Sequence, residues 1–390
     1  MDTETITPAL DAAKLDQLRT ALETHGPGPA IDALCEELRT AEDFQALFYA
    51  LLMKKRVELG VSPFPSGPSA DLPPETHEAY EESIRDAGRL VGGIFLERRQ
   101  FARAWGFFRM LGEIDPMREA LAAYTPSDED DTYSIVDIAW QQGVLPQKGF
   151  DLILDRHGIC SAITMVSSAD LSQNPDLRTY CIGNLVRALH QQLLERLRGD
   201  LGATKDLPAN ATIPQMVAAF PDLCADDIYH IDISHLQSVV QMASLLPKGP
   251  ELELAIDLCA YGAKLSPNLR GDMPAPFDGG YTDYAIYFNL LMERDVEAGL
   301  KHFRGKLAEA RLQQDTYPAE VLVNLLVKLN RVPEALAVAR EELAEAGPGL
   351  SCPSVMELAR QANDFSALAD AARISGDPVN YLAGLIAARM

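Results

Sequence analysis

A short phrase recurs along this chain: a polar turn is followed by Ala, Leu and aromatic residues at the spacing of an α-helix. It occurs at residues 100–105 (QFARAW), 295–300 (DVEAGL), 331–336 (RVPEAL) and 364–368 (DFSAL). A repeated turn and helix cannot bury its apolar stripe alone and becomes stable when it stacks on neighbouring copies. The phrase therefore predicts stacked helical pairs, and it says more about the fold than about the function.

The remaining helix patterns are regular toward the C-terminus and irregular in the middle. A chain of 390 residues also exceeds what a single hydrophobic core usually organises. We predict an N-terminal helical domain with one repeat-like pair (1–125), an irregular helical middle that holds a candidate site (126–282) and a regular helical array (283–390). The predicted class is all-α, a right-handed stack of antiparallel helical pairs with long loops. For residues 159–166 alone, the sequence allows either a helix or a strand, because their β-branched side chains favour extended structure.

Residues 319–348 resemble a tetratricopeptide (TPR) repeat. They contain an apolar helix, the turn 330–331, a second helix that opens with 334–336, and a closing Pro348. The segment departs from the family because it lacks the usual Trp, Gly and Tyr of the first helix and has Leu326 where a small residue is expected. The resemblance implies a TPR-like α-solenoid with a concave face that binds peptides or partner proteins, and it says little about activity.

Charge and cysteine content restrict the possible partners and location. The chain has 34 Lys and Arg against 57 Asp and Glu, a formal net charge of −23. Such a chain repels phosphate backbones and anionic lipids, so we expect neither nucleic acid nor a membrane surface as partner. It has no basic leader and no apolar run of about 20 residues, and its six cysteines form no CxxC pair. These features predict a cytoplasmic protein.

The densest group of potential ligands is His230, Asp232 and His235, and no Walker A, GxGxxG, HExxH or GxSxG motif accompanies it. Two imidazoles and a carboxylate can hold a divalent transition metal with open coordination positions. The alternative is structural, because Ser234 and Gln237 have the spacing of a capping box at a helix start. Both interpretations stay open at this point.

Two further groups could carry chemistry or complete the metal site. His157 and Cys160 could act as a base and a thiolate nucleophile, although Gly158 also fits the end of a helix. His77 and Glu81 share a helical face at i and i+4, as pairs of metal ligands do, but acids in a first helical turn also complement the helix dipole.

The sequence thus gives two functional hypotheses. The first is a cytoplasmic TPR-like protein whose concave face binds a peptide or a partner protein. The second is a metal-dependent enzyme on the same scaffold, with His230, Asp232 and His235 as ligands and with His157 or the His77 and Glu81 pair completing the site. The reaction type, the substrate and the metal are not determined by the sequence.

Overall fold

The computed structural model describes residues 10–64, 72–127, 130, 132–202, 208, 210–311, 315–344 and 349–390. Helices dominate these residues and no strand occurs among them, which confirms the all-α class. Residues 159–166, for which the sequence allows either a helix or a strand, lie in helix α9 (Gly158–Ser168). Among the described helices, none combines the length and apolarity needed to cross a bilayer.

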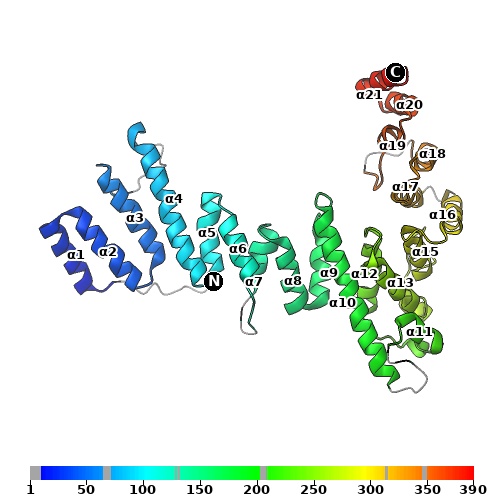
Figure 1. The fold of residues 1–390 in the computed structure, drawn as a ribbon, viewed down its shortest axis with the longest axis horizontal. Helices are drawn as coiled ribbons and strands as arrows, with labels where there is room; N and C mark the ends of the chain where they lie inside the picture. The colour runs from blue at the N-terminus through cyan, green and yellow to red at the C-terminus, as the bar shows by residue number, and fades with distance from the viewer. Residues whose placement is uncertain are drawn as a thin grey trace. The chain divides into compact units, whose positions relative to one another are not determined.

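The chain divides into two compact units, residues 1–156 (unit 1) and 157–390 (unit 2). The predicted boundary at 125/126 falls inside unit 1, and the one at 282/283 falls inside a helix of unit 2. In unit 1, successive helices pack on one another (Figure 1). These are α1 (Ala12–His25), α2 (Pro27–Thr40), α3 (Phe44–Glu58), α4 (Pro74–Glu97), α5 (Phe101–Leu111), α6 (Asp115–Ala123), α7 (Tyr133–Val136), the π-helical turn η2 (Asp137–Gln141) and α8 (Pro146–Arg156).

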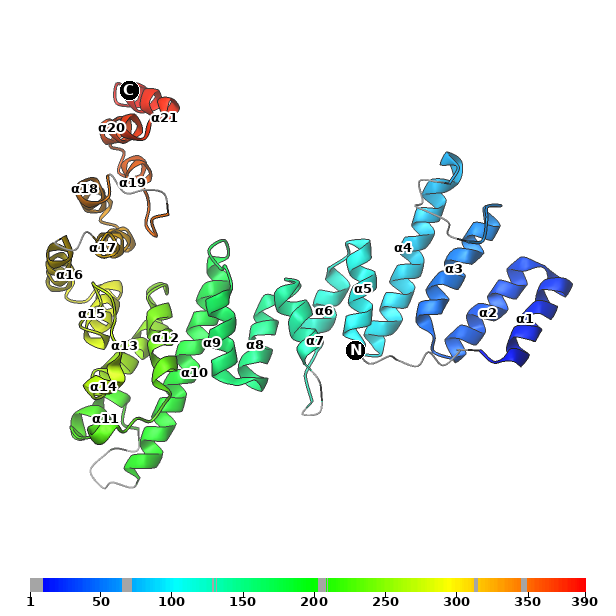
Figure 2. The same ribbon diagram turned by 180° about the vertical axis from the view of Figure 1, so that it is seen from behind.

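Unit 2 is organised around α10 (Pro175–Leu201), a 27-residue helix that packs against α9, α11, α12 and α13. From α16 onward each helix packs mainly on its neighbours along the chain, as both ribbon views show (Figure 2). The remaining elements are α11 (Ile213–Ala219), the 3-10 turn η3 (Ala225–Asp227), α12 (Ile233–Ala243), α13 (Pro250–Gly262), α14 (Pro267–Arg270), α15 (Tyr281–Leu291), α16 (Val296–Ala310), α17 (Tyr317–Lys328), α18 (Val332–Glu342), α19 (Val355–Gln361), α20 (Phe365–Ser375) and α21 (Pro378–Ala387).

The recurring sequence phrase coincides with one turn geometry. In the α4–α5, α17–α18 and α19–α20 turns, Arg99, Asn330 and Asn363 adopt left-handed conformations with φ of 58°, 57° and 54°. The next residue is the N-cap of the second helix, and its N–H donates to a carbonyl five residues earlier, at 2.8 to 2.9 Å. This is the Schellman motif, which ends one helix and starts the next within three residues.

The structure contains a further copy of this turn between α2 and α3. Glu42 has φ 58°, and the Asp43 N–H donates to the Leu38 carbonyl at 3.0 Å. The residues that follow, 43–47 (DFQAL), differ from 364–368 (DFSAL) at one position. The turn before 295–300 is one residue longer and has two left-handed residues, Glu293 and Asp295.

A glycine permits the close approach of α13 and α15 in unit 2. Gly262 ends α13, and the ring of the buried Tyr281 at the start of α15 lies where a side chain at residue 262 would extend. A Cβ added to Gly262 would lie 2.5 Å from an atom of that ring. The contact between these two helices therefore depends on the absence of a side chain there.

We expect Gly262→Ala to destabilise unit 2 by about 1–3 kcal/mol, because the added methyl group overpacks the contact with Tyr281. The matched control is Gly305→Ala on the exposed face of α16, where an added Cβ meets nothing within 4 Å. That control should stabilise by about 0.5–1 kcal/mol because Ala favours a helix interior. Denaturant unfolding of the full chain followed by circular dichroism measures both, and equal stability of the two variants would contradict the packing assignment.

Candidate functional site

The structure places His230 in the interior of unit 2, with both ring nitrogens near protein groups. Nδ1 lies 3.1 Å from the hydroxyl of Tyr261, and Nε2 lies 3.2 Å from a carboxylate oxygen of Asp200. The backbone N–H of His230 also donates to the Tyr261 hydroxyl at 2.8 Å. His230 therefore joins the end of α10 to α13 through hydrogen bonds.

Asp232 is the N-cap of α12. Its carboxylate accepts the backbone N–H groups of Ser234 and His235 at 2.8 and 3.2 Å, and it also accepts the Ser234 hydroxyl. The hydrogen bond from the Ser234 hydroxyl, followed by those from the backbone, holds the pKa of Asp232 below its usual value. The residues 230–235 therefore do contain a helix start, as the structural alternative predicted. The side chain that caps the helix is Asp232, however, and not the predicted pair of Ser234 and Gln237.

The other predicted site residues belong to other helices. His157 is the N-cap of α9, and Cys160 is an exposed residue in the first turn of that helix. His77 and Glu81 belong to unit 1, with Nε2 and Oε1 3.7 Å apart on α4. Throughout the described residues, no three His, Cys, Asp or Glu side chains gather in a way that could hold a metal ion.

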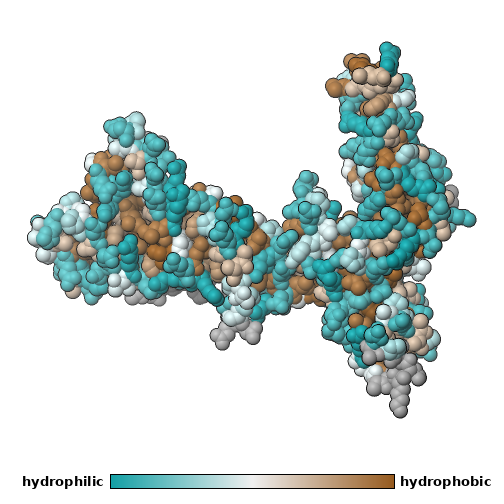
Figure 3. Space-filling view, viewed as in Figure 1, coloured by the Kyte–Doolittle hydropathy of each residue, from teal (hydrophilic) through white to brown (hydrophobic). Residues whose placement is uncertain are grey.

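Unit 1 instead contains an aromatic groove of about 720 Å³ between α3 and α5. Phe48 of α3 and Phe107 of α5 meet edge to face at 5.2 Å, and Phe95 of α4 lies against Phe107 at 5.9 Å. Hydrophobic side chains gather over the part of unit 1 that contains α3 to α5 (Figure 3). The groove is lined by Glu42, Asp43, Phe44, Gln45, Phe48, Tyr49, Phe95, Ala102, Arg103, Gly106, Phe107 and Met110. We call it the α3/α5 groove.

Two large side chains of the α3/α5 groove remain open to solvent. Tyr49 and Met110 are 56% and 53% exposed, although each lies in a helix with a buried apolar stripe. Aromatic and Met side chains are enriched where proteins contact partners, and the volume falls in the range of ligand sites. The groove can therefore accept an apolar side chain from a ligand.

Arg103 supplies positive charge at the edge of this groove. Its guanidinium carbon lies 5.8 Å from the centre of the Phe95 ring, and the residue is exposed. Among the described residues it has no ion-pair partner, whereas the neighbouring Arg98 pairs with Glu42. Arg103 is thus available to an acidic group outside the protein.

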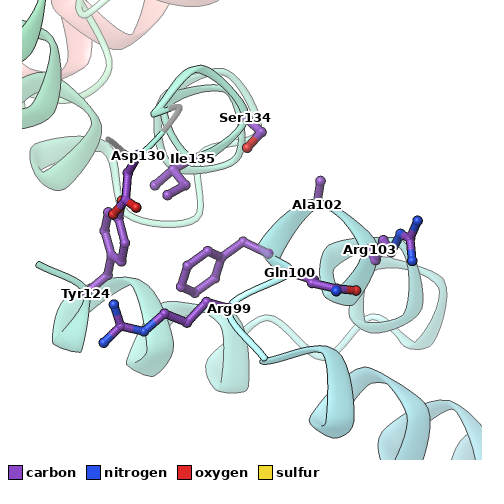
Figure 4. Close-up of a pocket in the computed structure, with 9 residues that line it drawn as sticks. Arg99, Gln100, Ala102, Arg103, Tyr124, Asp130, Ser134 and Ile135 are labelled. Carbon is purple, nitrogen blue, oxygen red and sulfur yellow. The ribbon is translucent and has the colours of Figure 1, made fainter. Parts of the chain in front are cut away.

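A smaller pocket of about 310 Å³ adjoins the groove and shares Ala102 and Arg103 with it. The Arg99 and Tyr124 side chains extend toward one another, with Asp130 beside Tyr124, while Arg103 points away from them (Figure 4). Arg99 also has no ion-pair partner in the described part of the chain. Within the described residues, two arginines without an ion-pair partner therefore lie at the start of α5.

The acid in the smaller pocket is already engaged. The carboxylate of Asp130 accepts the hydroxyl of Tyr124 at 2.8 Å and the backbone N–H of Ser127 at 2.9 Å. These bonds, the backbone one first, keep the pKa of Asp130 below its usual value. Burial, followed by the bond to Asp130, raises the pKa of Tyr124 to about 12. Arg99 is then the group of this pocket that can meet an incoming anion.

No protein-family model, curated protein or solved structure matches this chain. Sequence reasoning did not identify Tyr49, Arg103 or Met110 as site residues. One signal in the sequence could have found them. The segment 43–47 resembles 100–105, and this likeness indicates that α3 and α5 occupy equivalent positions after their turns.

Asp232→Ala should lower the stability of the protein by about 1 kcal/mol at neutral pH, because α12 loses its N-cap. Asp232→Asn, which still offers a side-chain oxygen, should lose much less. The cap contribution is complete above the unfolded pKa of an aspartate and disappears as the pH falls through the lowered folded value. Denaturant unfolding between neutral and strongly acidic pH measures this difference.

The metal hypothesis makes a different prediction for the same variants. If Asp232 were a ligand, Asp232→Ala and His235→Ala would both release metal from protein purified without a histidine tag. A shared loss of metal in elemental analysis, with no stability difference between Asp232→Ala and Asp232→Asn, would refute the capping role.

Proposed function

We propose that this chain is a cytoplasmic TPR-like α-solenoid protein that binds a peptide or an exposed segment of a partner protein. The α3/α5 groove of unit 1 is the binding surface in this proposal. The observation that carries it is a groove of about 720 Å³ in which Tyr49 and Met110 stay exposed beside a buried aromatic cluster. Solvent-exposed aromatic and Met side chains around one hollow are typical of contact sites.

The repeated turns support the helical-repeat part of this proposal. The same Schellman geometry occurs in both units, and each turn joins two helices that pack on each other. In repeat proteins, equivalent helices of successive units form a continuous surface for ligands. Helices α3 and α5, each the second helix after such a turn, are equivalent in this sense.

The groove also defines the chemistry of its ligand. Its floor is aromatic, so the ligand should present a large aliphatic or aromatic side chain. Arg103 at the rim and Arg99 in the adjoining pocket are both unpaired among the described residues, so an acidic residue should follow that anchor. An apolar groove with two arginines that have no ion-pair partner among the described residues is suited to a segment that is apolar and acidic.

The test is selection of short peptides from a random displayed library against the full chain, followed by fluorescence anisotropy of the selected peptides. The groove can be filled without touching the core by Gly106→Leu, because an added Cβ there meets nothing within 4 Å and the residue is exposed. We expect this variant to bind at least about tenfold more weakly, a loss of roughly 1.4 kcal/mol, and to remain folded.

Gly305→Leu on α16 is the matched control, since its added Cβ also meets open space and it lies outside the groove. It should bind like the original chain. Arg103→Glu should weaken the binding of peptides that carry an acidic residue and leave the binding of peptides without one unchanged. Peptides that bind Gly106→Leu as tightly as the original chain would show that the α3/α5 groove is not the binding surface.

A further inference from the structure

Helix α21 has an almost entirely apolar sequence, yet one long face of it is open to solvent. It contains no charged residue between Pro378 and Ala387. Val379, Leu382 and Ile386 have the i, i+3 and i+7 spacing of a single helical face, and they are 75%, 58% and 54% exposed. A helix that is apolar on all sides is normally buried. We therefore expect this face, which we call the α21 stripe, to have a cover.

The opposite side of α21 packs on α20, its main neighbour. Gly384 is the buried residue of α21, and a Cβ added there would lie 3.0 Å from the backbone nitrogen of Ala369 and from the carbonyl oxygen of Phe365, both in α20. At about 100° per residue, Leu382 and Ile386 each lie about 160° from Gly384 around the helix. The contact with α20 therefore does not use them. Hydrophobic residues gather over α20 and α21 in the space-filling view (Figure 3).

Charge decides which cover suits the α21 stripe. The chain has a net charge of −23, so two copies repel each other through most of their surface. Helix α21 has no acidic residue and adds nothing to this repulsion. Helices that lie in a membrane surface usually carry Lys and Arg on a polar face, and α21 carries neither. The complement of an uncharged apolar face is another such face, and a second copy of the chain supplies one.

The exposed apolar area is enough for a small interface. Tyr381 and Leu385 flank the α21 stripe and Ile374 lies at the end of α20, each at least 36% exposed. At about 60–120 Å² for a fully exposed aliphatic side chain, the stripe and these residues offer roughly 300 Å² per copy. Apolar atoms make up about 65% of a dimer interface, so two copies bury roughly 1,000 Å² in total. This area is near the lower limit for a specific contact and fits a weak, micromolar dimer.

We propose that the α21 stripe is a self-association surface, through which two copies of this chain pair around a two-fold axis. The axis passes near Leu382, in the middle of the stripe, so that Val379 of one copy lies against Ile386 of the other. The two helices then run antiparallel, which pairs opposite ends of their dipoles and brings Asp377 at one end toward Arg389 at the other. The surface belongs to unit 2 and does not rest on peptide binding by the α3/α5 groove of unit 1.

Sedimentation equilibrium of the full chain between about 1 and 100 μM tests the proposal, and the mass should double over this range. Leu382→Glu should weaken the association at least about tenfold, because two carboxylates then meet near the axis. Leu382 is exposed, so the variant should stay folded, which circular dichroism checks. Leu245→Glu, at an exposed leucine of unit 2 outside α21, is the matched control and should associate like the original chain.

A charge exchange identifies a second copy as the occupant. Leu382→Lys should associate as weakly as Leu382→Glu, because two ammonium groups also repel each other. An equimolar mixture of the two variants should associate at least about tenfold more tightly than either variant alone, since opposite charges then meet across the axis. A different partner protein or a lipid surface on the α21 stripe does not produce this rescue.

Three results would each overturn the proposal: a chain that stays monomeric over the whole range, undiminished association of Leu382→Glu, or no rescue in the mixture. A monomeric chain that binds phosphatidylcholine vesicles, with loss of that binding in Leu382→Glu, would assign the stripe to a lipid surface instead. Gly106→Leu should associate like the original chain, which separates this proposal from the one for the α3/α5 groove.

Discussion

The hydrogen bond from the N-cap of one helix to a carbonyl five residues earlier is the interaction on which the helical pairs depend. It forms at five equivalent turns, the fifth between α20 and α21, where Gly376 precedes the N-cap Asp377; each has a left-handed residue before the N-cap. Asn330 and Asn363 suit that conformation, whereas Glu42 and Arg99 adopt it at a conformational cost. The cost is tolerated because the turn reverses the chain within three residues and lets the apolar stripes of both helices meet.

The same turns place the residues of the proposed binding surface. Glu42 and Arg99 occupy the left-handed positions themselves, and Glu42 lines the α3/α5 groove while Arg99 lines the adjoining pocket. Phe44 begins the helix after one turn and packs against Phe95, which accepts the Schellman hydrogen bond of the next. The repeated turn therefore shapes both the helical pairs and the proposed binding surface.

Charged and polar side chains have different roles around residues 230–235 and at the proposed binding surface. Asp232 and His230 form hydrogen bonds within unit 2, so their polar atoms serve the fold. Many other bases of this acidic chain are engaged in ion pairs, such as Arg187 with Glu251. Arg99 and Arg103 have no ion-pair partner among the described residues and line the α3/α5 groove or its adjoining pocket, where an external anion can neutralise them.

The sequence by itself determined the helical class and most of the turns, since helix periodicity and capping depend on neighbouring residues. It could not separate a metal site from a helix cap at 230–235, because His, Asp and Ser at that spacing serve both. Nor could it tell that Tyr49 and Met110 stay exposed, since exposure depends on which helix covers a stripe. Only the tertiary structure decided that, and only it brought His230 to Tyr261 and Asp200, because such long-range contacts come from the packing of α10, α12 and α13.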